Sequence, residues 1–356
     1  MAGEAGVRLF GLPAQGPLSA LCRFHPRLGW DLEPGAEARF RVPGEYDTRV
    51  RVNRAGMRGP LPPGKNAPGQ VRILALGDEE TLGVSVGEKQ AYPFLLAAAL
   101  GRRGLRVFPL DGGVEGYSTD QEYLWFLYEG AFLHAELVLL AFRPEDAFWV
   151  TRKDYYGIPK PKIAFVPGAG GSRLIPRFSG NPSAWERPFW RRSRLLELLL
   201  SPGVPFLRTG KGKEVPGPLA AFLFRPPQAV LQGWKRVEAL LAGLKQAVEK
   251  RGGLLLAFPL PHRSQVRGEA THALLDRFGL TLRDWNVDGP TSRFLEAARL
   301  AGVETANPLG FFRQAAASGK VLFYPRSGHL TPAGHLLLAH VLEWKLLQLG
   351  WRGLGR

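Results

Sequence analysis

The sequence contains very little cysteine and no long hydrophobic run. Cys22 is the single cysteine in 356 residues, so the chain cannot form an internal disulfide and does not need an oxidising compartment. No apolar stretch reaches the roughly 18–20 residues that a membrane-spanning helix requires. The first 24 residues also lack the basic start and unbroken apolar core of a signal peptide. These absences predict a cytoplasmic protein, and an exported or membrane-associated origin is the alternative.

Recognition motifs for nucleic acid and for metals are absent too. The chain has no zinc-finger spacing, helix-turn-helix or aromatic RNA-binding signature, and His262 and His272 lack metal-ligand spacing. We therefore predict neither a metal site nor a cofactor. The sequence does not specify an oligomeric state.

Charge, by contrast, is abundant and one-sided. Lys and Arg number 47 against 31 Asp and Glu, which gives a formal net charge of +16. Such an excess attracts polyanions and anionic membrane surfaces of any kind. A solvated basic surface is the simpler interpretation. A binding face for acidic glycan, lipid headgroups or nucleic acid is the alternative.

Strand and helix patterns alternate along most of the chain, as in parallel βαβ units. They predict an α/β domain over residues 71–350, preceded by a lead-in with a small β ribbon over residues 1–70. Residues 149–225 break the rhythm with proline and basic residues, which indicates a surface insertion containing one helix at 191–200. The expected strands lie at 71–76, 105–110, 136–142 and 254–258, and the expected helices at 91–103, 119–132, 234–250, 269–278 and 331–349.

Polar residues follow three of the predicted strands and precede the last helix. They are Gly77-Asp78-Glu79, Asp111-Gly112-Gly113, Glu145-Asp146 and Ser327-Gly328-His329. Ligands of open α/β sheets bind beyond the carboxyl ends of the parallel strands. We therefore expect these four segments to form the functional site.

Four segments resemble, in order and spacing, the sequence blocks of the SGNH (GDSL-type) hydrolase family. They are RILALGDEETLGVSV, DGGVEGYSTDQEYLWFL, ELVLLAFRPED and YPRSGHLTPAGHLLLAHVL, and NRAGMRGP resembles an element that precedes the domain in one subgroup. The resemblance covers roughly residues 25–349. It implies a flavodoxin-like three-layer α/β/α sandwich with a parallel central sheet. It also implies a relation to enzymes that hydrolyse acyl or acetyl esters of carbohydrates or lipids.

The resemblance implies a role for each site position, but most of the residue types differ. Glu79 stands at the nucleophile position, Glu145 at the position of the oxyanion-binding asparagine, and Ser327 at the position of the triad aspartate. Two positions match the family, Gly113 as the oxyanion glycine and His329 as the catalytic histidine. We also expect three neighbours to contact the ligand: Asp78, Tyr117 and Asp146.

These exchanges argue against ordinary esterase chemistry. Glu79 cannot form the usual acyl ester, and Glu145 would repel a developing oxyanion. Ser327 could orient His329 but would not stabilise an imidazolium as a carboxylate does. Removing one triad member typically lowers the rate by about 10⁴–10⁶.

Three functions follow from this pattern. The first is a ligand-binding protein that keeps the cleft and has lost catalysis. The second is an active hydrolase in which a carboxylate and His329 act with water or a divalent cation. The third is a basic scaffold that binds polyanions.

Overall fold

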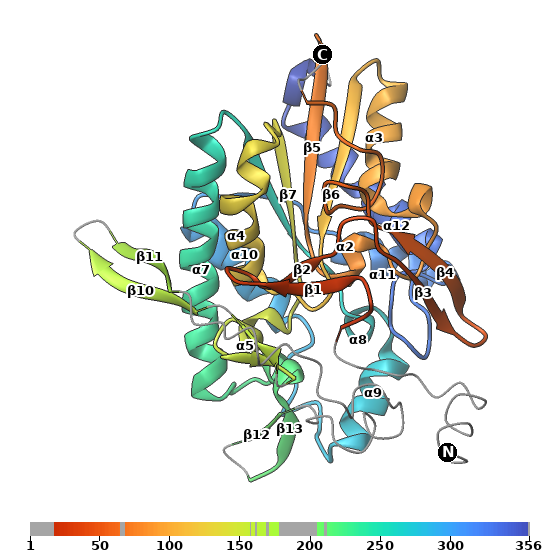
Figure 1. Ribbon diagram of the computed structural model, residues 1–356. Coiled ribbons are helices and arrows are strands. Elements are labelled where there is room, and N and C mark those ends of the chain that lie inside the picture. The colour runs from red at the N-terminus through yellow and green to blue at the C-terminus, as the bar shows by residue number, and fades with distance from the viewer. Residues whose placement is uncertain are drawn as a thin grey trace, which may run out of the picture.

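A parallel sheet forms the centre of the molecule (Figure 1). The computed structural model describes residues 18–64, 68–156, 158–160, 162–168, 171–177, 205–209 and 212–354. The sheet has the order β6-β5-β7-β14-β15. Its strands are β5 (Gln70–Gly77), β6 (Arg106–Gly113), β7 (Leu137–Phe142), β14 (Leu254–Pro259) and β15 (Glu304–Thr305). In chain order this is the 2-1-3-4-5 arrangement of flavodoxin-like folds, so the predicted fold class is confirmed.

Helices cover both faces of this sheet. Figure 1 shows α4 (Thr119–Tyr128), α7 (Gln228–Glu249) and α10 (Gly289–Leu300) on one side, and α3 (Tyr92–Arg102) and α12 (Pro332–Gln348) on the other. The remaining α-helices are α2 (Glu79–Leu82), α5 (Asp146–Trp149), α8 (Arg263–Val266), α9 (Gly268–Arg277) and α11 (Leu309–Ala317). No helix in the described ranges is long and apolar enough to span a bilayer.

Alternation along β5 separates the two hydrophobic cores. Leu74 and Leu76 pack with α4, α7 and α10, whereas Ile73 and Ala75 pack with α3 and α12. Successive side chains of a strand point to opposite faces, so a continuous apolar run is needed to fill both layers. This is why the strand patterns were recognisable in the sequence.

The last helix begins as its sequence predicts. The Thr331 side chain accepts a hydrogen bond from the Gly334 amide at 3.2 Å, and Pro332 occupies the first helical position. Both are favourable choices at a helix start. The helix is thereby fixed directly after His329, at the end of the sheet where the site lies.

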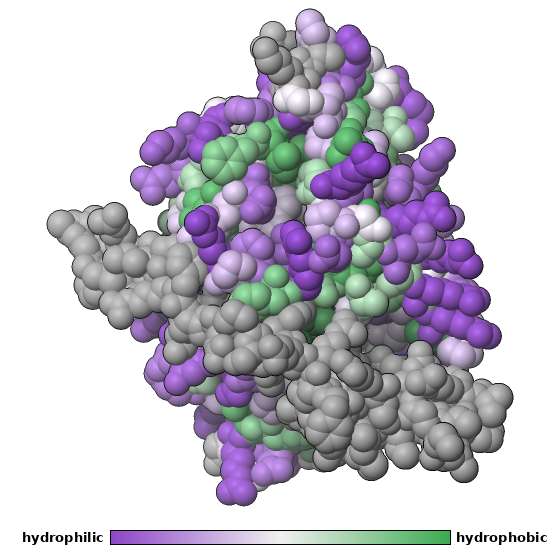
Figure 2. All heavy atoms as spheres, in the orientation of Figure 1, coloured by the Kyte–Doolittle hydropathy of each residue, from purple (hydrophilic) through white to green (hydrophobic). Residues whose placement is uncertain are grey.

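The lead-in forms two hairpins rather than the one ribbon expected. β1 (Cys22–His25) pairs with β2 (Gly29–Leu32), and β3 (Glu37–Val42) pairs with β4 (Tyr46–Arg51). Figure 2 shows hydrophilic side chains gathered over the β3–β4 hairpin. Its arginines lie beside acids, with Arg39 2.6 Å from Asp47 and Arg51 2.6 Å from Glu37. Much of the positive charge of this hairpin is thus paired within the hairpin itself.

Arg58 attaches the lead-in to the α/β domain. Its side chain is 2 % exposed and donates to the carbonyl oxygens of Leu82 and Gly83, both at 2.6 Å, and of Val86 at 2.9 Å. A buried guanidinium is tolerated when its donors are satisfied. Arg58 therefore holds the loop that follows α2 in place.

Part of the predicted insertion is packed into the domain instead of lying on its surface. It contains β8 (Asp154–Tyr155), β9 (Ile158–Pro159), β10 (Lys162–Gly168), β11 (Gly171–Arg177), β12 (Phe206–Arg208) and β13 (Glu214–Pro216). Val215 and Phe222 are buried in the larger of the two hydrophobic cores. Apolar side chains at these positions favour burial over a surface location. The helix expected at 191–200 lies outside the described residues.

Candidate functional site

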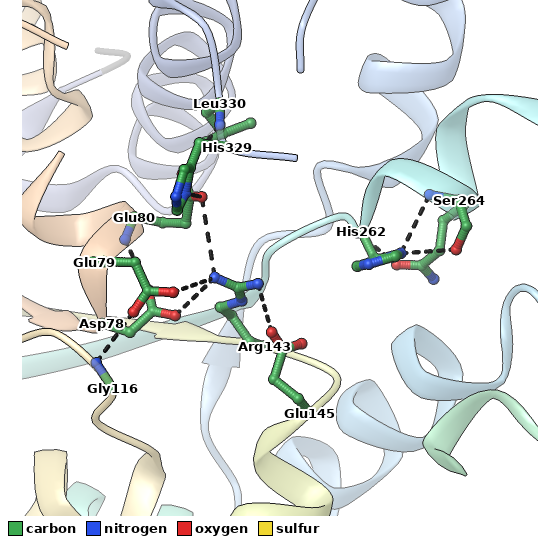
Figure 3. A network of polar contacts seen from close by, with 11 residues as sticks. Asp78, Glu79, Glu80, Gly116, Arg143, Glu145, His262, Ser264, His329 and Leu330 are labelled. Carbon is green, nitrogen blue, oxygen red and sulfur yellow. Dashed lines mark hydrogen bonds and ion pairs between the residues drawn. The ribbon is translucent and has the colours of Figure 1, made fainter. Parts of the chain in front are cut away.

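Asp78, Glu79 and Glu80 follow β5 at the carboxyl edge of the sheet (Figure 3). The Asp78 carboxylate caps α2 by accepting a hydrogen bond from the Glu80 amide at 2.9 Å. Glu79 and Glu80 then extend in different directions. Glu79 accepts a hydrogen bond from the Gly116 amide at 3.1 Å, and Glu80 reaches the loop that carries His329.

Arg143, at the end of β7, is the centre of the site. Its Nη1 atom lies 3.0 Å from the carboxylates of both Asp78 and Glu79 and 4.0 Å from that of Glu80. Its Nη2 atom pairs with Glu145 at 2.5 Å. One guanidinium therefore bridges Glu79 and Glu145, the two carboxylates that the resemblance assigns to the nucleophile and oxyanion-asparagine positions. Planar guanidinium groups suit this role because they present several donors in fixed directions.

Glu80 is the direct partner of His329. One carboxylate oxygen contacts Nδ1 of the imidazole, and the other accepts a hydrogen bond from the Leu330 amide at 3.1 Å. The Tyr46 ring packs edge-on against the imidazole at 6.0 Å between centroids. A carboxylate on Nδ1 fixes the orientation of a histidine ring and stabilises its charged form. Glu80 thus supplies the contact that the resemblance assigns to position 327.

The pKa values reflect this pairing. Burial raises the pKa of Glu80, but His329 and then Arg143 outweigh burial and lower it to about 2. Burial lowers the pKa of His329, but Glu80 outweighs burial and raises it above its ordinary value. Burial and the adjacent Glu79 raise the pKa of Asp78 well above its usual range, against the opposing effect of Arg143. Each partner thus favours the ionised form of the other, against the effect of burial.

The backbone amide that contacts Glu79 belongs to Gly116 and not to Gly113, the glycine to which the resemblance assigns the oxyanion role. The Gly113 amide donates to Asp111 Oδ1 at 3.0 Å, and a side chain there would lie 2.3 Å from the Leu82 nitrogen. Its glycine identity serves close packing against α2. Gly116 is the glycine whose amide meets Glu79, with a φ of +69°. Gly113 and Gly116 share the same segment, so the sequence pattern alone did not separate them.

Ser327 does not orient the imidazole of His329. Its hydroxyl oxygen lies 3.4 Å from the His329 backbone amide, and its own amide donates to Glu45 at 2.9 Å. Glu45 comes from the turn between β3 and β4 and also accepts from the Arg326 amide. The lead-in hairpin therefore secures the loop that carries His329.

Tyr117 and Asp146 lie behind the site, in the protein interior. The Tyr117 hydroxyl donates to the Trp30 carbonyl at 2.6 Å. Asp146 accepts from the Thr119 hydroxyl at 2.8 Å, and burial and Glu145 raise its pKa to about 8. Both side chains are thus buried and hydrogen-bonded within the protein, and ligand contact by these two residues stays a prediction. Asp78 faces Arg143, and its carboxylate forms an ion pair with the Arg143 guanidinium.

A small hollow of about 30 Å³ opens beside Arg143. Glu80, Arg143 and Glu145 line one side, and His262 and Arg263 from the segment after β14 line the other. Leu260, Phe323 and Leu330 provide apolar walls. The volume suits one small chemical group.

Sequence reasoning missed four residues of this site: Glu80, Arg143, Gly116 and His262. Glu80 and Arg143 stood inside the recognised segments, and the excess of acids around Arg143 was the signal that a cation had to compensate them. His262 follows a predicted strand, where ligand contacts are expected. The described residues contain no group of three or more His, Cys, Asp or Glu arranged to hold a metal ion. Arg143 lies among the carboxylates where a cation would otherwise sit.

Comparisons with known proteins find weak similarity to solved structures only. No protein-family model matches the chain. No curated protein sequence matches it either. Solved structures that align with it include the acetyl xylan esterase AlAXEase, at 11 % identity over 78 % of this chain and 100 % of that one, with a TM-score of 0.43. A G-D-S-L family protein from Desulfitobacterium hafniense aligns at 9 % identity over 78 % and 99 %, with a TM-score of 0.39. The lipase/acylhydrolase from Enterococcus faecalis aligns at 10 % identity over 78 % and 96 %, with a TM-score of 0.41.

These structures carry esterase, lipase or G-D-S-L names, the class that the sequence blocks resemble. The activities in those names belong to the proteins concerned.

Proposed function

We propose that this chain is an SGNH-type protein that binds a glycan or acyl-bearing ligand at the carboxyl edge of its sheet and does not hydrolyse it through an acyl-enzyme. One observation carries the proposal. Arg143 bridges Glu79 and Glu145 while Glu79 accepts the Gly116 amide. Both the nucleophile position and the oxyanion donor are thereby engaged in contacts within the protein.

The arrangement opposes acyl transfer at two points. Acyl transfer needs a hydroxyl or thiol that a base can deprotonate, and donors that are free to bind the developing oxyanion. The Glu79 carboxylate offers no such hydroxyl, and it already occupies the Gly116 donor. A substrate carbonyl would have to displace a charge-assisted hydrogen bond, which is one of the stronger contacts in proteins.

His329 supports the same proposal. Its raised pKa favours the imidazolium, and an imidazolium can donate a proton but cannot accept one. In its imidazolium form the residue is a positively charged hydrogen-bond donor beside Glu80. This environment is better suited to donating a hydrogen bond to a ligand oxygen than to removing a proton from a substrate.

A second candidate function rests on the Glu80–His329 contact itself. A carboxylate on the Nδ1 atom of a histidine is the pairing that hydrolases use to position a base, and here Glu80 provides it. A hydrolase in which this pair activates water would need pH values above the raised pKa of His329. Its activity would therefore rise in alkaline solution.

Hydrolysis of a short-chain aryl ester, with and without divalent cations, separates the two candidates. We expect no turnover above the uncatalysed rate, and no difference between wild type and His329→Ala. His340→Ala is the matched control, because His340 is an exposed histidine on α12. Turnover that His329→Ala abolishes and His340→Ala leaves intact would refute the first proposal.

Restoring the family residues tests where catalysis was lost. The first variant combines Glu79→Ser, Glu145→Asn and Ser327→Asp, and the second adds Arg143→Leu. The second is included because the guanidinium loses Glu79 and Glu145 as partners in the first and would remain in the site. We expect esterase activity from the second variant. A folded and inert second variant would contradict our assignment of these positions.

A further inference from the structure

The hollow between Glu145 and His262 has a hydrogen-bonding pattern of its own. His262 is the N-cap residue of α8, where its Nδ1 atom accepts from the Ser264 amide at 3.2 Å and contacts the Ser264 hydroxyl at 2.7 Å. With Nδ1 acting as an acceptor, the ring proton resides on Nε2. Figure 3 shows this other edge of the ring directed toward Arg143 and Glu145.

The Nε2–H group has no hydrogen-bond partner among the described residues, although the ring is largely enclosed. The ring packs against Phe222 at 5.4 Å between centroids. Burial lowers the pKa of His262 to about 4, so the ring is neutral at pH 7. The hollow therefore has a neutral donor on one side.

Glu145 provides an acceptor on the opposite side. One of its carboxylate oxygens pairs with Arg143. The other has no hydrogen-bond partner within the described part of the chain, and the Glu145 side chain is 20 % exposed. The hollow thus combines an unused donor with an unused acceptor.

The formal charge around the hollow cancels. Arg143 and Arg263 contribute two positive charges, and Glu80 and Glu145 contribute two negative charges, so the sum is zero. Each of the two arginines already has partners, since Arg143 binds carboxylates and Arg263 donates to the Pro325 carbonyl at 2.6 Å. A charged ligand group would meet an equal number of like charges. The balance favours an uncharged group.

We propose that this hollow binds a hydroxyl group of an uncharged polyol, which accepts from His262 Nε2–H and donates to Glu145. A hydroxyl can do both at once, because it carries one donor and two acceptor lone pairs. Leu260 and Phe323 contact the attached carbon. A sugar and the glycerol part of a lipid both present this chemistry. The inference rests on the proposed function in that the ligand is held and not hydrolysed.

Nuclear magnetic resonance of ¹⁵N-histidine-labelled protein tests the site directly. Glycerol and D-xylose serve as the two polyol probes, and acetate and tetramethylammonium as charged probes of similar size. We expect one or both polyols to shift the Nε2 signal of His262 in a saturable manner, with the signal of the exposed His340 unchanged. The preferred polyol distinguishes the lipid source from the sugar source.

His262→Asn is the matched variant. Asparagine is a good helix cap, so it keeps the acceptor for the Ser264 amide and removes the Nε2 donor. Loss of one hydrogen bond should weaken polyol binding about tenfold. His340→Asn should leave it unchanged. Equal binding by His262→Asn, a response to acetate or tetramethylammonium in place of the polyols, or no response to any probe would each overturn the proposal.

Two measures keep the result interpretable. If His262→Asn fails to fold, the titration of the wild-type His262 signal still decides the question. The probes carry no ester, so hydrolytic activity in the aryl-ester assay would refute the proposed function without altering this binding measurement. Absence of polyol binding, in turn, would leave the conclusion about acyl transfer standing.

Discussion

Arg143→Met removes the only cation that contacts Glu79 and Glu145 among the described residues. The Arg143 side chain is 22 % exposed, and its four carboxylate partners are between 8 % and 23 % exposed. Breaking a buried ion pair by deleting one partner costs about 3–5 kcal/mol, because the remaining charge is left uncompensated. We expect the free energy of unfolding to fall by about 3 kcal/mol, since the site retains some contact with water.

The loss should depend on pH. Burial and Glu79 already raise the pKa of Asp78 above its usual range, and Arg143 opposes that rise. Without Arg143 the folded-state pKa of Asp78 rises further above the unfolded value. The native state then binds more protons than the unfolded state, so stability falls as pH increases. The deficit of Arg143→Met should be smaller at about pH 5 than at about pH 7.5.

Urea unfolding at the two pH values measures both effects. Arg299→Met is the matched control, because Arg299 forms an exposed pair with Glu296 on α10 and its loss should change stability little. Our account of the site would be refuted if Arg143→Met were as stable as Arg299→Met. It would also be refuted by a deficit that stays constant or grows toward acidic pH.

Three further substitutions test other parts of the structure. Glu80→Gln should lower the pKa of His329 in an NMR titration. The pair stabilises the fold most where Glu80 is ionised and His329 is protonated, so the stability deficit should be largest between the ordinary pKa of Glu80, 4.5, and the raised pKa of His329. It should shrink at more acidic and at more alkaline pH. An unchanged His329 pKa would contradict the pairing. Gly116→Ala should destabilise by about 2 kcal/mol more than Gly35→Ala in urea unfolding, because both have positive φ but only Gly116 would place a methyl group 2.5 Å from the Tyr155 ring. Equal losses would argue against close packing at Gly116. Lys160→Met should lower the free energy of unfolding by about 3–5 kcal/mol, because the buried ammonium group pairs with Asp120 at 3.0 Å. Lys320→Met, on the surface, should lower it little. Equal thermal unfolding of the two variants would refute the role of Lys160 as the buried partner of Asp120.

Much of the fold could be predicted because it depends on periodicity. The apolar runs of β5, β7 and β14 fill two layers and stand out in the sequence, and the α7 positions Val237, Leu240, Leu241, Leu244 and Val248 are all buried as the helical spacing requires. The short elements of the insertion and the second lead-in hairpin have too few residues for such a pattern. Their placement depends on tertiary contacts such as that of Arg58.

The site was only partly predictable for a different reason. The segments that meet at the sheet edge could be named from strand ends, but the partner of each side chain depends on rotamers and loop paths. Glu79 and Glu80 are neighbours in the chain and yet face Gly116 and His329 respectively. The sequence indicated that a carboxylate replaces the nucleophile. It could not indicate that the adjacent carboxylate takes over the contact expected from position 327.

The multiple contacts of Arg143 constrain the order in which such a site can be changed. A serine or asparagine beside Arg143 leaves a cation that still has Asp78 and Glu80 within reach. A glutamate at 79 or 145 without Arg143 leaves an uncompensated and largely buried carboxylate, at a cost of several kcal/mol. Mutagenesis that builds this site should therefore introduce Arg143 before the glutamates, and mutagenesis that dismantles it should remove Arg143 after them. On that route every glutamate at 79 or 145 has its cation, whereas the reverse route passes through chains with an uncompensated carboxylate, a large cost against the small net stability of a typical domain.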